Sequence, residues 1–164
     1  MMTLRLAQAR DVQAVEAIFR RAVADMCDRF IFQWDNIYPA VETVRQDIDN
    51  GDMYLLCDGA KIAGVIVLNE EQCDEYSQGS WKCNEPAAVV HRLCVDPLHQ
   101  HKGYGKQAMQ LAHIMLKEQG YQSVRLDVFS QNPHALNLYE SLGYIQVGSV
   151  ELRKGLFYLF EKSL

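Results

Sequence analysis

The sequence lacks the cysteine pattern of a disulfide-stabilised or zinc-binding domain. Its five cysteines are an odd number, and no two of them have the Cys-x-x-Cys spacing of zinc and redox motifs. Cys94, His99 and His101 come closest to a metal-ligand group, but no further His or Cys is spaced to complete a tetrahedral set. We therefore expect free thiols and no bound metal.

Positive charge and long apolar runs are also scarce. Lys and Arg number 16 against 21 Asp and Glu, which gives a net charge of -5 at pH 7. This balance disfavours attraction to nucleic acid or to anionic lipid. The apolar run Ile62–Leu68 is far shorter than the roughly 18–20 residues that cross a bilayer, and the N-terminus lacks the apolar core of a signal peptide. We expect a soluble, cytoplasmic protein that binds neither nucleic acid nor membrane.

The composition is that of one globular domain. The chain has 164 residues, of which 49% are hydrophobic, and no repeat or Pro/Gly/Ser-rich linker divides it. We expect a single domain over residues 1–164. The polar stretch Asn69–Glu85 is expected to form a long loop or an irregular hairpin.

Apolar residues recur at helical spacing in four segments, and residues that favour helix ends bound them. The predicted helices begin at Asp11 and at Pro39, and cover Tyr104–Gln119 and Pro133–Leu142. Seven apolar runs are predicted to be strands: Thr3–Ala7, Met53–Cys57, Ile62–Leu68, Ala87–Val95, Ser123–Phe129, Tyr144–Val150 and Leu156–Glu161.

The order of these elements predicts a mixed sheet and the α/β class. Asp58-Gly59 joins two of the strands as a tight hairpin, because Gly accepts positive φ. The strand, helix and strand from Ala87 to Phe129 imply a parallel crossover, and the flanking hairpins imply antiparallel pairs. The aromatic last strand, Phe157–Phe160, is expected at a sheet edge, where it favours a homodimer.

The segment between the buried strand and the helix that begins at Tyr104 has the properties of an anion-binding turn. Gly103 and Gly105 let the backbone approach a ligand closely, and a helix N-terminus directs N–H groups and partial positive charge at the same place. Lys102 and Lys106 add formal charge. A turn that needs its glycines for steric reasons alone is the alternative.

Two other phosphate-binding motifs do not fit this turn. The dinucleotide motif Gly-x-Gly-x-x-Gly would need a third glycine where the chain has Ala108. The P-loop would need Ser or Thr where Gln107 follows Gly105-Lys106.

Two segments resemble motifs of the GCN5-related N-acetyltransferases, the GNAT family. Residues 100–105, Gln-His-Lys-Gly-Tyr-Gly, are similar to its Gln/Arg-x-x-Gly-x-Gly/Ala signature, and they follow a strand ending in Leu-Cys-Val-Asp-Pro. Residues 132–144 resemble its Asn-x-x-Ala-x-x-Leu-Tyr-x-x-x-Gly-Phe/Tyr block. The order of elements matches over nearly the whole chain. The resemblance implies the acyl-CoA N-acyltransferase fold: a twisted, mainly antiparallel sheet with a central splayed parallel strand pair and about four helices.

The resemblance also implies acetyl-coenzyme A (acetyl-CoA) as the donor. The backbone of Leu93, Cys94 and Val95 would pair with the pantetheine arm, and Asn132 and Ala135 would contact the arm from the other side. The pyrophosphate would be cradled by the motif residues Gln100, His101, Lys102, Gly103, Tyr104, Gly105 and Lys106.

Four side chains are candidate proton donors or acceptors. Tyr139 occupies the motif position near the coenzyme sulfur, where a phenol can protonate the leaving thiolate; packing in the core is its alternative. His91 interrupts an apolar strand and is the first candidate base, because its reference pKa of about 6.5 suits proton uptake near pH 7. A structural role is the alternative for His91. Glu70 or Glu71 would be the rival base, or part of a solvated acidic turn.

The acceptor is the least defined partner. In this fold Phe30, Trp34 and Tyr38 would surround the acceptor entrance, or else pack between the first helices. Nearby carboxylates favour a cationic amine slightly. We hypothesise direct transfer of an acetyl group to a primary amine of a small molecule or peptide in a ternary complex, because the thiol pKa of Cys94 in a buried strand would be raised. A catalytically silent coenzyme A-binding module is the alternative.

Overall fold

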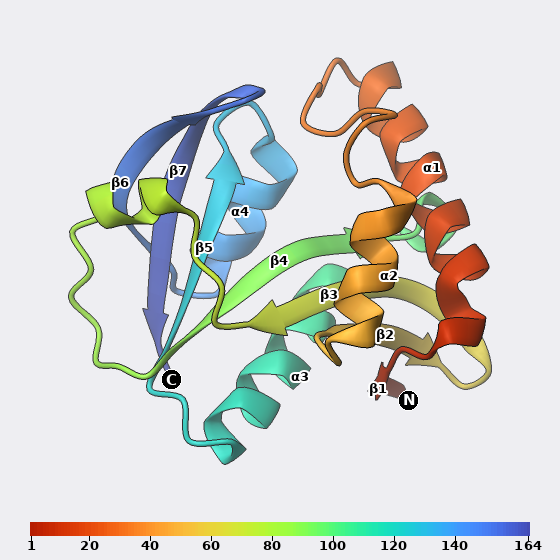
Figure 1. Ribbon diagram of the computed structural model, residues 1–164, viewed down its shortest axis with the longest axis horizontal. Coiled ribbons are helices and arrows are strands. Elements are labelled where there is room, and N and C mark those ends of the chain that lie inside the picture. Colours follow the sequence, from red (N-terminus) through yellow and green to blue (C-terminus); the bar gives the residue numbers. More distant parts are fainter. The chain divides into compact units, whose positions relative to one another are not determined.

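Seven strands form one mixed sheet in the computed structural model, which describes residues 1–164. Their order across the sheet is β1-β2-β3-β4-β5-β7-β6 (Figure 1). The strands are β1 Met2–Leu6, β2 Met53–Asp58, β3 Lys61–Asn69, β4 Ala87–Val95, β5 Ser123–Phe129, β6 Ile145–Leu152 and β7 Gly155–Ser163. β4 and β5 run parallel, whereas β1–β2, β2–β3, β5–β7 and β6–β7 are antiparallel. The predicted α/β class with a mixed, mainly antiparallel sheet is confirmed.

Four α-helices accompany the sheet, as predicted. They are α1 Val12–Asp28, α2 Val41–Asp49, α3 Tyr104–Glu118 and α4 Pro133–Ser141, with short 3-10 turns η1 Ala9–Asp11, η2 Asp74–Gln78 and η3 Pro97–His99. Pro39 does not begin α2, because Ala40 is still extended. The polar stretch 69–85 is not irregular throughout, since η2 lies within it.

Asp11 precedes α1 but does not cap it with its side chain. Its buried carboxylate instead accepts hydrogen bonds from the Arg5 guanidinium at 2.9 and 3.0 Å and from the Gln8 backbone N–H at 2.8 Å. These bonds close η1 and tie it to β1.

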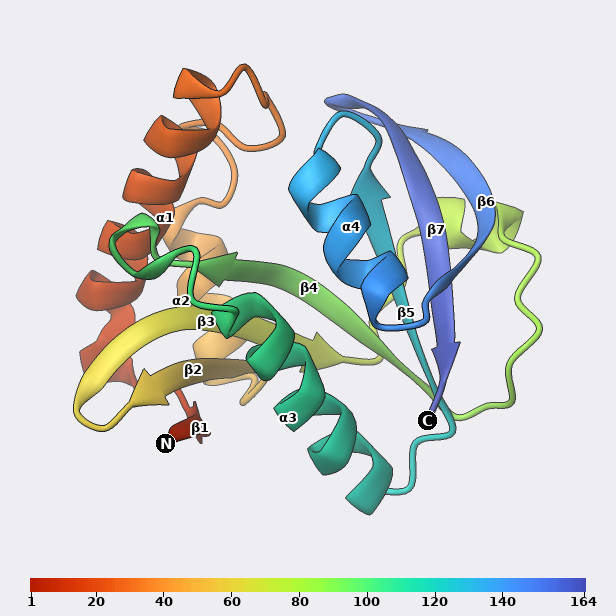
Figure 2. The same cartoon turned by 180° about the vertical axis from the view of Figure 1, so that it is seen from behind.

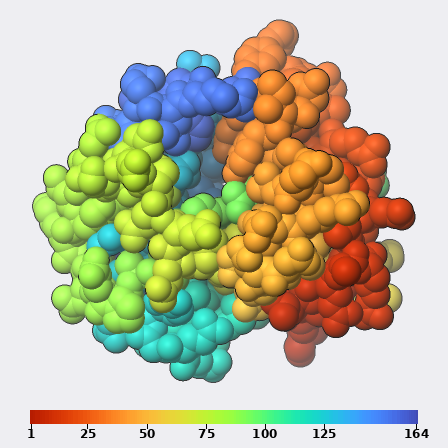
Figure 3. Space-filling model, viewed as in Figure 1, coloured from red at the N-terminus to blue at the C-terminus, as the bar shows by residue number.

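The chain divides into two units, residues 1–68 with 91–112 and residues 69–90 with 113–164. In the first unit, α1 and α2 lie on one face of β2 and β3, and the beginning of α3 lies on the other face (Figure 1 and Figure 2). In the second unit, α4 lies on one face of β5 and η2 on the opposite side (Figure 1 and Figure 2). Figure 3 shows the 69–85 segment, in yellow-green, at the surface of this unit.

The core of the first unit follows the helical spacing read from the sequence. Val15, Ile18, Phe19 and Ala22 form the buried face of α1 and pack in one cluster with Val44 and Ile48 of α2 and with residues of β2 and β3. Burial of each large apolar side chain stabilises the fold by about 1.5–3 kcal/mol. This cluster holds the helices against the strands.

A buried ion pair joins β4 to α2. Arg92 donates from Nε and Nη2 to the two carboxylate oxygens of Asp47 at 2.7 and 2.6 Å, and from Nη1 to the Tyr38 hydroxyl at 2.7 Å. Arg92 also has a positive φ of 49°. Strict alternation therefore does not continue through Arg92, so it cannot be used to place His91 on the same face as Leu93 and Val95.

The expectation that the last strand lies at a sheet edge is wrong. β7 lies between β5 and β6, and the edges are β1 and β6. The sequence indicates a β6–β7 hairpin but not which of its strands pairs with β5. The homodimer was expected because the last strand would lie at an edge, so this reason for expecting it no longer holds.

Breaking the Asp47–Arg92 pair is expected to be costly. Asp47→Asn leaves the guanidinium buried without a counter-charge and should lower the free energy of unfolding by about 3 kcal/mol. The matched control Asp49→Asn, an exposed position on the same helix, should change it by less than about 0.5 kcal/mol. Urea titration followed by circular dichroism measures both. Equal stability of the two variants would show that the pair contributes nothing.

Candidate functional site

The turn after β4 is organised by the carboxylate of Asp96. This buried side chain accepts from Arg21 Nε at 2.9 Å and Nη2 at 2.6 Å, and from the Leu98 backbone N–H at 3.1 Å. Burial alone would raise the pKa of Asp96, but the hydrogen bonds from Arg21 and Leu98 outweigh it and hold the pKa below its ordinary value. The charged carboxylate thus ties α1 to the start of η3.

The backbone between η3 and α3 has the shape of an anion-binding turn. His101 and Gly103 both adopt positive φ, at 63° and 72°. α3 begins directly afterwards at Tyr104, so the N–H groups of its first turn have no acceptor within the helix. The space where a Cβ would stand at Gly103 is open within 4 Å. Together with the helix dipole, this backbone suits a phosphate group.

Side chains of the turn make contacts that the sequence did not indicate. Gln100 accepts through Oε1 from Arg29 Nη2 at 3.0 Å and donates through Nε2 to the Val95 carbonyl at 3.5 Å. The Tyr104 hydroxyl donates to Asp58 Oδ2 at 3.0 Å. These bonds anchor both ends of the turn to the first unit.

Cys94 is unsuited to nucleophilic attack. Its side chain is buried, and burial, followed by the nearby charge of Asp96, raises the pKa of the thiol far above its ordinary value. The backbone of β3 also approaches closely here, because a Cβ at Gly64 would meet the Cys94 carbonyl oxygen at 2.5 Å. A thiol in this position stays protonated at neutral pH.

In the second unit, α4 positions Asn132 and Tyr139. Asn132 caps the helix by accepting from the Ala135 backbone N–H through Oδ1 at 3.1 Å, a role that the sequence analysis did not foresee. Tyr139 is buried, and its ring packs edge-on against Tyr144 with centroids 5.6 Å apart. Burial, followed by the charge of Asp127, raises the pKa of the Tyr139 phenol. The phenol therefore keeps its proton at neutral pH.

Another tyrosine, Tyr76, contacts the Asp127 carboxylate directly. Tyr76 of η2 is buried and donates its hydroxyl hydrogen bond to Asp127 Oδ2 of β5 at 2.7 Å. Burial is the largest cause that raises the pKa of Tyr76, and Asp127 adds to it. This pair could not be foreseen from the sequence, because Tyr76 lies in the polar stretch for which a loop is expected.

The candidate bases lie in different surroundings. His91 is half-buried on β4 in the first unit. Glu70 is exposed in the second unit, where its Oε1 accepts from the Tyr121 hydroxyl at 2.7 Å. The neighbouring Glu71 donates its backbone N–H to the Asn69 side chain at 2.9 Å.

The three aromatic residues expected at the acceptor entrance differ in exposure. Phe30 is 79% exposed and has a positive φ of 58°. Trp34 is buried and packs edge-on against Phe19 with centroids 5.4 Å apart, which matches the core alternative. Tyr38 accepts from Arg92, whose guanidinium lies 5.9 Å from its ring centroid.

No group of three or more His, Cys, Asp or Glu side chains is arranged to hold a metal ion. None of the helices combines the length and the apolar character that crossing a membrane requires.

Comparison with known proteins identifies the family. The model of the acetyltransferase (GNAT) family matches residues 15–144, which include both motifs. The chain belongs to this family. A curated relative, the L-amino acid N-acyltransferase MnaT of Escherichia coli, is 25% identical over 150 residues, which are 88% of this chain and 80% of that protein.

Solved structures share the fold. A GNAT acetyltransferase from Streptococcus agalactiae superimposes with a TM-score of 0.87 at 20% identity, covering 99% of this chain and 95% of that one. The protein yncA from Salmonella typhimurium, solved with its cofactor acetyl-CoA, gives a TM-score of 0.72 at 17% identity and covers 99% and 94%. The expectation of a GNAT acetyltransferase with this fold is confirmed.

His113 should make stability depend on pH. Its Nε2 lies 2.7 Å from the hydroxyl of Tyr144, and burial, followed by Lys162, lowers its pKa to about 4. The folded protein therefore resists protonation that the unfolded chain accepts near pH 6.5, so this contribution is complete above that pH and is lost as the pH falls toward 4. His113→Gln should show a smaller loss of melting temperature between pH 7 and pH 5 than the unaltered protein.

The matched control is His134→Gln, an exposed position on α4. It should follow the pH profile of the unaltered protein. If His113→Gln also followed that profile, His113 would not be the titrating group.

Proposed function

We propose that this chain transfers an acetyl group from acetyl-CoA directly to a primary amine of a small molecule or peptide, within a ternary complex. The observation that carries the proposal is the turn from Asp96 to Tyr104, in which a buried carboxylate fixes the start and positive-φ residues lead into a helix N-terminus. Acetyl-CoA supplies an acetyl group activated as a thioester.

The turn would hold the donor by its pyrophosphate. Backbone N–H groups in the segment Gln100–Lys106 are the proposed donors, and exposed Lys102 and Lys106 add charge. Leu93, Cys94 and Val95 would offer backbone groups to the pantetheine arm, and Asn132 and Ala135 would contact it at the start of α4. A phosphate suits the site because Gly103 leaves open space on its Cβ side.

Tyr139 is the proposed acid. Because its pKa is raised by burial and by Asp127, the phenol is protonated over the whole physiological pH range and can donate at the sulfur as the thiolate leaves. Since Cys94 is held as a neutral thiol, no acyl-enzyme is proposed.

The acceptor amine must lose a proton before attack. We propose His91 as the base. Glu70 is the second choice, because its carboxylate is exposed and already accepts from Tyr121. Phe30 and Tyr38 are the remaining candidates for contact with the acceptor, since the Trp34 side chain is buried among core residues.

Relatives with different acceptors make an amine acceptor plausible for this chain. MnaT is named as acting on L-amino acids. The ribosomal-protein-S18-alanine N-acetyltransferase of Escherichia coli shares the fold with a TM-score of 0.71 at 20% identity. These two acceptors share a primary amine.

Two measurements distinguish this proposal from a silent coenzyme A-binding module. Acetyl-CoA should bind in calorimetry, and a panel of amines, amino acids and peptides should release free thiol from it. Protein incubated with acetyl-CoA alone should not gain the mass of an acetyl group. Binding without turnover on any amine would favour the silent module, and an accumulating acetylated protein would contradict direct transfer.

Tyr139→Phe removes only the hydroxyl and keeps the ring. We expect kcat to fall by roughly 10²- to 10⁴-fold on the best acceptor, with little change in the dissociation constant of acetyl-CoA. Tyr158→Phe, another tyrosine of the same unit, is the control and should retain activity. Unchanged turnover in Tyr139→Phe would mean that the proton comes from another group or from solvent.

A further inference from the structure

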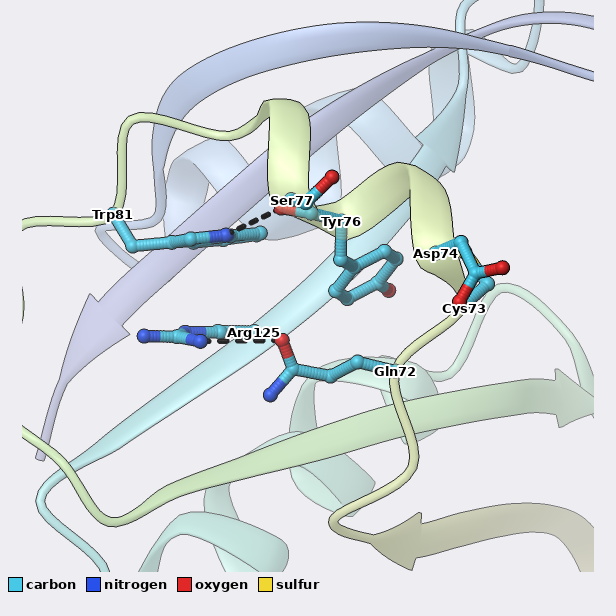
Figure 4. Close-up of a pocket in the computed structure, with 7 residues that line it drawn as sticks. All are labelled: Gln72, Cys73, Asp74, Tyr76, Ser77, Trp81 and Arg125. Atoms are coloured by element: carbon cyan, nitrogen blue, oxygen red, sulfur yellow. Dashed lines mark hydrogen bonds between the residues drawn. The ribbon is translucent and has the colours of Figure 1, made fainter.

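A pocket in the second unit lies outside the residues assigned so far to donor binding. It has a volume of about 480 Å³ and is formed between the segment 72–81 and Arg125 of β5 (Figure 4). Trp81 covers it on one side, and Gln72 and Tyr76 lie on another (Figure 4). The complete lining consists of Gln72, Cys73, Asp74, Tyr76, Ser77, Trp81 and Arg125.

Arg125 is the unusual member of this lining. Its side chain is 7% exposed, and its guanidinium lies against the Trp81 indole, 4.6 Å from the ring centroid. Nη1 donates to Gln72 Oε1 at 3.2 Å, and Nη2 donates to Glu85 Oε1 at 3.1 Å. Nε is buried and has no hydrogen-bond partner. Such a donor is costly to leave unsatisfied.

Two other arginines of the chain show which partner fits the edge of a guanidinium that is formed by Nε and Nη2. Arg21 and Arg92 each use Nε and Nη2 together, against both oxygens of Asp96 and Asp47 respectively. This is the bidentate geometry that a guanidinium offers to a planar carboxylate. In Arg125 the same edge is only half used, because Glu85 contacts Nη2 alone.

Glu85 is a replaceable partner. Its side chain is 73% exposed, whereas Arg125 is 7% exposed. Ion pairs with such an exposed member contribute little to stability, because water and salt compete for the charge. A second carboxylate that accepted from both Nε and Nη2 of Arg125 would satisfy the buried Nε–H group, which Glu85 does not contact.

The pocket is also connected to the proposed acid. Tyr76 lines the pocket and donates to Asp127, two residues after Arg125 on β5. The charge of Asp127 acts in turn on Tyr139. A ligand anchored at Arg125 would therefore lie against Tyr76, whose hydroxyl contacts Asp127.

We propose, on the basis of the proposed function, that Arg125 binds a carboxylate of the acceptor, so that the preferred acceptors are amines that also carry a carboxylate group. Arg125 acts as a specificity-determining residue, and Trp81 holds its guanidinium in place. Glu85 occupies part of the edge until the acceptor replaces it.

Binding alone tests the pocket without any reaction. The probes are N-acetyl-L-leucine, N-acetyl-L-methionine and N-acetyl-L-phenylalanine with their primary amides, titrated by calorimetry into the protein with coenzyme A present. We expect at least one acid to bind at least tenfold more tightly than its amide. Arg125→Lys, which cannot form the bidentate contact, should weaken that acid by about 10- to 100-fold, and the control Arg20→Lys should not.

Glu85→Gln should act in the opposite direction and tighten the acid by about two- to fivefold, because it removes the competing carboxylate. This exposed substitution leaves the buried side chain intact, so its result decides the matter even if Arg125→Lys does not fold. Equal affinity for every acid and its amide, or unchanged or weaker acid binding in Glu85→Gln, would overturn the inference.

Turnover separates this inference from the proposed function. L-Leucine, L-methionine and L-phenylalanine are compared with their amides in the thiol-release assay, and Arg125→Lys should raise KM for the acids with little change in kcat. Transfer with KM values unaffected by Arg125→Lys would overturn this inference and leave the proposed function intact. If no amine were acetylated, the proposed function would fail, and so would the assignment of the bound carboxylate to an acceptor.

Discussion

The carboxylate of Asp96 is the contact on which the donor-binding turn depends. It is one of few buried charges in the chain, and it remains charged because Arg21 and the Leu98 N–H group both donate to it. These bonds fix α1, the end of β4 and η3 in one arrangement. The backbone that follows adopts positive φ at His101 and Gly103, and bonds of Gln100 and Tyr104 anchor its two ends.

In the other unit a second carboxylate, that of Asp127, interacts with two buried tyrosine side chains. It accepts from Tyr76 and raises the pKa of Tyr139, so it affects both the wall of the Arg125 pocket and the proposed acid. Burial is the larger cause that raises the pKa of both phenols, and the charge of Asp127 adds to it.

Local patterns in the sequence predict much of the fold. β4 and β5 have the predicted bounds, and α3 begins at the predicted Tyr104, because apolar periodicity and glycine at the helix end are local signals. The two GNAT motifs likewise lie in short segments. The family could therefore be predicted before any contact was known.

Contacts between distant residues could not be predicted in this way. Arg21 and Asp96 are 75 positions apart, and Arg92 and Asp47 are 45 apart, so no periodicity relates them. The hydrogen-bond partners of Arg125, Gln72 and Glu85, are 53 and 40 positions away. The two strands of the β6–β7 hairpin are both apolar, so the sequence does not indicate that β7, and not β6, pairs with β5 inside the sheet. Burial of Trp34 depends on Phe19, which lies in a different segment.

The most direct test of the account is whether the turn after β4 binds pyrophosphate through its backbone. Protein labelled with ¹⁵N would be titrated with coenzyme A and, separately, with pantetheine, which lacks the pyrophosphate. We expect coenzyme A to shift the backbone amide signals of Gly103, Tyr104, Gly105 and Lys106, and pantetheine to leave them in place. Amide signals that do not respond to coenzyme A, or that respond equally to pantetheine, would contradict the account.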